Sequence, residues 1–153
     1  RFTGVERRFQ IVGEYVGALV VDDYAHHPTE IQATLEAARR TYPERRLVAL
    51  FQPHLYSRTR DFCEGFAEAL ALADLALVSP IYAAREEPLE GVTSSLIVDA
   101  ATTHGARNVQ LVDRDRAGIV AQLRETLRRG DIFVTMGAGD VHHVGEDLVG
   151  APS

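Results

Sequence analysis

The chain has 153 residues, a length that suits one hydrophobic core, so we expect residues 1–153 to form a single domain. Its formal net charge of −6 gives no electrostatic support for a nucleic-acid partner. No apolar run approaches the roughly 20 residues that a membrane span needs, and the polar first residues do not resemble a secretory leader. Cys63 is the only cysteine, which excludes an internal disulfide. We therefore expect a cytoplasmic protein with no membrane partner.

The chain contains no lysine, and all 16 of its basic residues are arginine. A phosphate-binding loop of the form G-x-x-x-x-G-K-[ST] requires a lysine for the β- and γ-phosphates of ATP. Any ATP chemistry must therefore take its main phosphate contacts from another domain. The abrupt basic start at residues 1–5 also leads us to expect a piece of a longer protein.

The first elements are predicted to be a hairpin or edge strand over residues 7–15, a strand over 18–21 and a helix over 28–42. Pro28 suits the first helical position, and Pro43 ends the helix. Later apolar runs predict strands at 47–51, 75–78, 109–112 and 132–136. Helices are predicted between them, the second ending at about residue 73, the others at 94–104 and 115–129 with Gly130 as the C′ residue, and a short helix in the tail.

Strand and helix alternate from residue 18 to residue 140. This alternation predicts an α/β, Rossmann-like fold with a mostly parallel sheet of about five or six strands and helices on both faces. Three polar loops, at residues 22–27, 52–60 and 137–143, follow strands of this sheet. Because parallel strands end at one edge, we expect these loops to meet there and bind an anionic ligand.

Arg58 and Arg60 are predicted near the start of the second helix, where positive charge opposes the helix dipole. An anion at that position would explain them, with Arg58 as the fork for a carboxylate or phosphate. Less specific interpretations stay open, because Asp22 or Asp23 can simply accept backbone N–H groups at a strand end, and His54 can be a core histidine. No histidine spacing matches a known zinc motif, so we expect no metal site.

Two long motifs resemble the C-terminal domain of the Mur ligase family, the ATP-dependent enzymes of peptidoglycan synthesis. They are DDYAHHPTEI at residues 22–31 and FQPHLYSRT at residues 51–59. Shorter matches follow in order at residues 4–9, 82–86 and 137–140. The first motif is shared with the family member that attaches a whole tripeptide, whereas the second is typical of the alanine-adding branch.

The resemblance implies an enzyme of three domains, of which this chain is the last. The first domain binds UDP-N-acetylmuramate, the central domain carries the phosphate-binding loop and the Mg²⁺ ligands, and the C-terminal domain closes over ATP and L-alanine. The family phosphorylates the muramoyl carboxylate, and the alanine amine then attacks the acyl phosphate. This arrangement accounts for the missing lysine and implies that the chain alone is inactive.

The motifs imply roles for individual residues. Asp23 would contact the ATP ribose and Arg8 would lie beside the nucleotide, while Tyr24 and His26 would line the cleft between ATP and the amino acid.

His54 and Arg58 would hold the alanine carboxylate. Many family members have arginine where this chain has Leu55, so a second contact to the carboxylate is missing from the pattern. Arg85 and Asp140 lie in the shorter matches and are weaker candidates. The alternative from another class is a nucleotide-binding module without chemistry.

Overall fold

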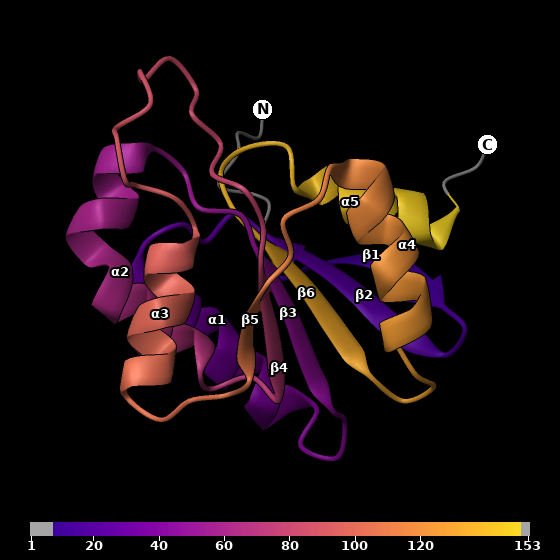
Figure 1. Ribbon diagram of the computed structural model, residues 1–153. Helices are drawn as coiled ribbons and strands as arrows, with labels where there is room; N and C mark the ends of the chain where they lie inside the picture. The colour runs from indigo at the N-terminus through magenta and orange to yellow at the C-terminus, as the bar shows by residue number, and fades with distance from the viewer. Residues whose placement is uncertain (1–7, 151–153) are drawn as a thin grey trace.

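A six-stranded sheet forms the centre of the structure, a computed structural model that describes residues 8–150 (Figure 1). The strand order is β1-β2-β6-β3-β4-β5. The strands are β1 (Gln10–Tyr15), β2 (Ala18–Asp23), β3 (Leu47–Phe51), β4 (Leu75–Val78), β5 (Val109–Leu111) and β6 (Ile132–Met136). The helices are α1 (Pro28–Thr41), α2 (Tyr56–Leu70), α3 (Ser95–Thr103), α4 (Arg116–Thr126) and α5 (His142–Val149).

Five of the strands are parallel, and β1 pairs antiparallel with β2 at the edge. The predicted hairpin and the mostly parallel sheet are therefore confirmed. The last strand, β6, lies between β2 and β3. Residues 4–7 of the short match at residues 4–9 lie outside the described residues. Within residues 8–150 no helix is long and apolar enough to cross a membrane.

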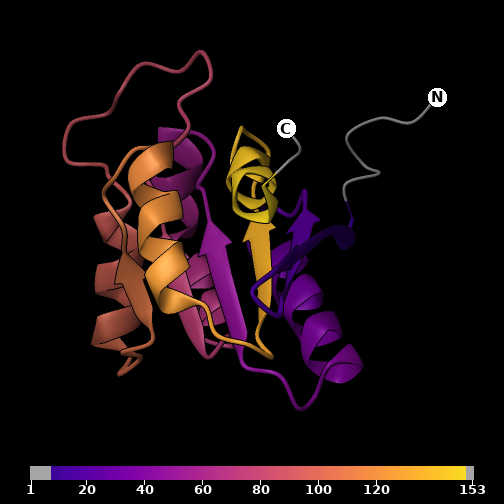
Figure 2. The ribbon, with the colours of Figure 1, turned by 90° about the vertical axis from the view of Figure 1, so that its right-hand side faces the viewer.

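Helices cover both faces of the sheet, as the alternation predicts (Figure 2). On one face, α1, α2 and α3 pack through Ile31, Leu35, Phe66 and Ile97, all at most 1% exposed. On the other face, α4 and α5 pack through residues that include Leu123. Strands β3 and β6 are buried along their whole length, which explains their strongly apolar sequences, whereas the edge strand β5 is exposed at Gln110 and Leu111.

Strand β2 is longer than its apolar run indicates, because Asp22 and Asp23 belong to it rather than to the following loop. Asp22 pairs in register with Gln10 of β1 and Thr135 of β6. The Thr135 hydroxyl donates a hydrogen bond of 2.7 Å to the buried Asp22 carboxylate, which satisfies part of its hydrogen-bonding capacity inside the sheet.

Two helix ends were predicted wrongly. Helix α2 ends at Leu70 rather than near residue 73. Helix α4 ends at Thr126 rather than residue 129, so Gly130 is not its C′ residue, and Leu127 already has an extended backbone. The early end of α4 is explained by Asp131. Its buried carboxylate accepts hydrogen bonds from the Arg128 N–H and from the Arg46 side chain.

Replacing Asp131 with alanine is expected to reduce the free energy of unfolding by about 2–3 kcal/mol. The substitution removes a two-bond ion pair with Arg46, at 2.7 and 3.1 Å, and leaves the half-buried guanidinium without that partner. Urea denaturation measures the effect. Asp61→Ala is the control, because Asp61 pairs with Arg60 on the surface, and such pairs contribute little. Equal stabilities of the two variants would contradict the role given to Asp131.

Candidate ligand site at the carboxyl edge of the sheet

The strand order brings three polar loops together, as predicted. Because β6 lies between β2 and β3, the segments that follow these strands are direct neighbours. The Gly137 N–H donates to the Asp23 carbonyl at 3.3 Å, and the Gln52 N–H donates to the Met136 carbonyl at 3.0 Å. The chain leaves β2 and β3 toward one face and β6 toward the other, a divergence that opens a crevice where ligands bind in such folds.

Asp23 and Arg8 form one end of the site. Asp23 is 3% exposed, and its two carboxylate oxygens accept hydrogen bonds from the backbone N–H groups of Phe9 and Ala25, both at 2.8 Å. Burial raises the pKa of Asp23, and these hydrogen bonds oppose the rise. Arg8 lies 3.6 Å from Asp23 and 3.4 Å from Glu30. Asp23 thus anchors the chain locally, as the less specific interpretation holds.

The start of α1 is capped by Glu30, whose carboxylate accepts hydrogen bonds from the N–H groups of His26 and His27 at 3.0 and 3.2 Å. Burial alone would raise the pKa of Glu30, but these donors and the nearby charges lower it. The His26 Nδ1–H donates to the Tyr24 carbonyl at 2.9 Å. The segment between β2 and α1 is therefore held rigidly, with the rings of Tyr24 and His26 at 5.2 Å.

Three histidines and an arginine form a histidine cluster beside this segment. The rings of His26 and His27 are 5.0 Å apart, and those of His26 and His54 are 6.3 Å apart. Arg58 donates to the Nδ1 of His54 at 3.5 Å. Burial, followed by the charges of Arg58 and His26, lowers the pKa of His54, and the same causes lower that of His27. Both rings are therefore neutral near pH 7, and Arg58 supplies the permanent positive charge.

The anion expected at the start of α2 is present, but it belongs to the chain itself. Glu86, from the loop between β4 and α3, accepts hydrogen bonds from the N–H groups of Tyr56 and Ser57 and from the Ser57 hydroxyl. The position of Arg58 and Arg60 near a helix start therefore needs no external anion. The N-cap residue, Leu55, has a φ of 74° and no capping side chain, so this local strain is held by the surrounding contacts.

A cavity of about 290 Å³ opens next to the crevice, between the end of β3 and the first turns of α4 and α5. The cavity is lined by Gln52, Tyr82 and Asp140. Arg114, which precedes α4, and Arg116, its first residue, line it as well. The Gln52 amide donates to Asp140 at 2.8 Å, while its buried carbonyl oxygen has no partner. A Cβ on Gly139 would meet the Tyr82 ring at 2.6 Å, so this glycine permits the close packing of that ring.

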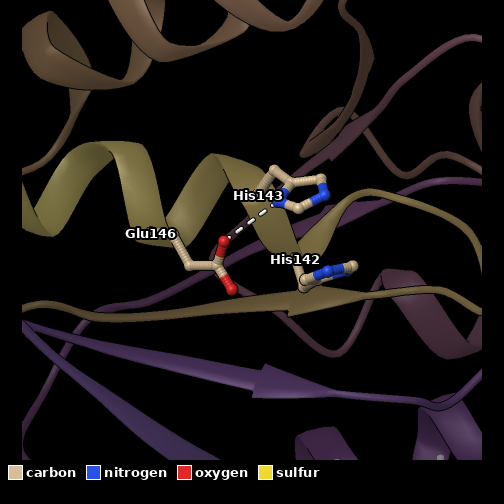
Figure 3. A group of neighbouring side chains, drawn as sticks. All are labelled: His142, His143 and Glu146. Carbon is tan, nitrogen blue, oxygen red and sulfur yellow. Dashed lines mark hydrogen bonds and ion pairs between the residues drawn. The ribbon is translucent and has the colours of Figure 1, made fainter. Parts of the chain in front are cut away.

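The remaining histidines do not join the histidine cluster. His142 and His143 begin α5, and Figure 3 shows them beside Glu146 of the same helix. Ligand atoms of these three residues lie within 4.8 Å of one another, so the group could hold a metal ion. The His143 Nδ1, however, already pairs with Glu146 at 2.9 Å, and both side chains are more than 40% exposed, at 43% and 47%.

Six of the predicted site residues lie close together. The contacts are Arg8–Asp23, Tyr24–His26, His26–His54 and His54–Arg58, and Asp23 and Tyr24 are neighbours in the chain. Asp140 lies apart from this chain of contacts, on the cavity with Gln52. Arg85 is exposed on the loop. The sequence did not reveal Glu86 or Tyr82 as contact residues, although both fall within the short match at residues 82–86.

Titration of His54 tests the electrostatics of the histidine cluster. By NMR, its imidazole should titrate below the ordinary histidine pKa of about 6.5. Arg58→Ala should raise the pKa of His54, because it removes a facing positive charge. Arg60→Ala is the control, since Arg60 pairs with Asp61 instead. A His54 pKa that is ordinary in the wild type and unmoved in Arg58→Ala would refute the arrangement.

Comparison with known proteins identifies the class. Residues 7–139 match the model of the family described as Mur ligase, glutamate ligase domain. This match covers well over half of the chain, so the chain belongs to that family, and the family predicted from the motifs is confirmed.

Curated relatives with high identity are named as alanine-adding members of this family. The UDP-N-acetylmuramate–L-alanine ligase of Cutibacterium acnes is 51% identical over 150 residues, which cover 97% of this chain and 31% of that protein. The ligase of the same name from Desulfosudis oleivorans is 47% identical over 146 residues, which cover 95% of this chain and 32% of that protein. This chain therefore spans about a third of the length of these curated relatives.

Solved structures agree in fold. A UDP-N-acetylmuramate–alanine ligase from Thermotoga maritima matches with a TM-score of 0.71 and 27% identity, over 94% of this chain and 29% of that one. A murein peptide ligase from Psychrobacter arcticus matches with a TM-score of 0.75 and 26% identity, over 97% of this chain and 31% of that one. The Rossmann-like fold expected from the alternation of strands and helices is therefore confirmed.

Proposed function

We propose that residues 1–153 are a single domain, the C-terminal domain of a cytoplasmic, ATP-dependent ligase that joins L-alanine to UDP-N-acetylmuramate in peptidoglycan synthesis. The main support is the 51% identity to an alanine-adding ligase across 97% of this chain. The ring and guanidinium contacts that bring together His26, His54 and Arg58 also support it, because these residues come from both long motifs.

The proposed partners are the N-terminal and central domains of the same enzyme, with ATP, Mg²⁺, L-alanine and UDP-N-acetylmuramate as ligands. Domains that meet across a modest interface move relative to one another, so this domain would close over bound ATP as a lid. Closure would exclude water from the acyl phosphate, which is otherwise open to hydrolysis.

The described residues fit the ribose end of ATP better than its phosphates. Asp23 would contact a ribose hydroxyl, with Arg8 beside it at the edge of the sheet. Tyr24 and His26 lie next along the chain, in position to line the cleft. When bound, ATP supplies the phosphoryl group that activates the muramoyl carboxylate. With no lysine in the chain, the phosphates and Mg²⁺ would be held mainly by the central domain.

His54 and Arg58 would bind the alanine carboxylate and so direct the alanine amine toward the activated carboxylate. Arg58 provides the charge, and the neutral His54 ring would add a hydrogen bond. Since Leu55 offers no charged group, the carboxylate would depend on Arg58 more strongly than in relatives with arginine at that position. Arg85 and Asp140 remain weaker candidates for contacts in the closed form.

The alternatives are a tripeptide-adding muramate ligase and a nucleotide-binding module without chemistry. A full-length enzyme that uses the tripeptide but not alanine would establish the first alternative. Nucleotide binding without any ligation would establish the second.

Arg58→Ala in the full-length enzyme should lower kcat/KM for alanine, mainly through KM. Loss of a charge-assisted contact costs about 2–3 kcal/mol, which is on the order of 30–150-fold. Steady-state ADP release at varied alanine concentration measures this change. Arg60→Ala is the matched control, and it should behave as the wild type because its side chain pairs with Asp61 at the surface. Unchanged alanine kinetics in Arg58→Ala would remove the proposed carboxylate site.

The 153-residue chain alone should release no ADP from ATP in the presence of UDP-N-acetylmuramate and alanine. The expected reason is that it lacks a lysine-containing phosphate loop. A coupled assay for ADP, with the full-length enzyme as the positive control, measures this. Sustained turnover by the chain alone would show that its own residues carry the chemistry.

A further inference from the structure

We propose that Glu86 is a positioning residue of the amino-acid site, which it organises by capping α2 and so fixing Arg58 and His54. This inference rests on the proposed function for the identity of the amino acid. Glu86 does not touch the substrate in this arrangement. It acts through the backbone and the side chains that do.

The contacts of Glu86 concentrate on the first turn of α2. Its carboxylate accepts hydrogen bonds from the N–H groups of Tyr56 and Ser57 and from the hydroxyl of Ser57. A helix start leaves such N–H groups without intrahelical partners, and here no residue of α2 or its N-cap supplies a capping side chain. Glu86 therefore replaces the local cap from a segment 30 residues away in sequence.

The same loop also holds His54. The Tyr82 N–H donates to the Pro53 carbonyl at 2.8 Å, and the Leu55 N–H donates to the Tyr82 carbonyl at 2.9 Å. The Tyr82 ring is stacked on the His54 ring at 5.8 Å. His54 and the first turn of α2 are thus fixed by one loop at two points, Tyr82 and Glu86, and Arg58 follows Ser57 directly in that turn.

Capping by Glu86 also decides how a substrate carboxylate can bind. A helix N-terminus usually attracts anions through its free N–H groups, but here Glu86 occupies those of Tyr56 and Ser57. A ligand carboxylate is therefore left to the side chains of Arg58 and His54. The negative charge of Glu86 raises the pKa of His54 and so opposes the effect of the Arg58 charge on it.

Glu86→Gln in the full-length enzyme tests the proposal, because it keeps the shape of the side chain and removes its charge. The KM for alanine should rise by about tenfold through loss of positioning, while the KM for ATP stays close to the wild-type value. By NMR, the pKa of His54 should fall further in Glu86→Gln, because a facing negative charge is lost. A purely structural role for Glu86 would not raise the KM for alanine while leaving the KM for ATP unchanged.

Glu87→Gln is the matched control, since it removes the same charge from the next, exposed residue. The proposal is overturned if the two variants share the same alanine KM. Failure of the wild-type full-length enzyme to use alanine at all would instead refute the proposed function. Turnover by the wild type, combined with identical behaviour of the two variants, would refute the role of Glu86 alone.

Discussion

The insertion of β6 between β2 and β3 is the constraint on which the rest of the structure depends. β6 pairs in parallel with both neighbours, from Ile132 to Met136. This pairing puts the segments after three strands at one edge and sends the chain away from β6 on the opposite face. Buried parallel strands tolerate few substitutions, so the positions of the polar groups above them are determined by the core below.

The second organising feature is a balance of charge at that edge. Two internal carboxylates, Glu30 and Glu86, cap the helices that begin beside the crevice. They satisfy the helix starts without a ligand, while burial and Arg58 keep the neighbouring imidazoles neutral. The hydrogen bond of Arg58 is therefore made to the neutral His54 ring. An incoming carboxylate would offer this cation an opposite charge. The proposed specificity for an amino acid depends on this arrangement.

Sequence patterns predicted most of the fold correctly. The bounds of β3 and β4 follow directly from continuous apolar runs, those of β6 from a run that only Thr135 interrupts, and Pro28 marks the first residue of α1. The errors lie where distant residues intervene. Helix α4 ends early because the carboxylate of Asp131 binds the Arg128 N–H, and periodicity carries no information about that contact. Likewise, only the pairing with Gln10 and Thr135 shows that Asp22 lies in a strand.

By itself, the sequence determined the fold class, the family and the loops that meet at the carboxyl edge of the sheet, and it predicts that any phosphate contacts come from elsewhere. These properties reside in local patterns, in long motifs and in the absence of lysine. Only the tertiary structure decided that the anion at the start of α2 is Glu86, and that Asp23 accepts a hydrogen bond from the Phe9 N–H. The physical reason is that hydrogen bonds between residues 14 to 30 positions apart depend on how the sheet brings loops together, and no local preference encodes that.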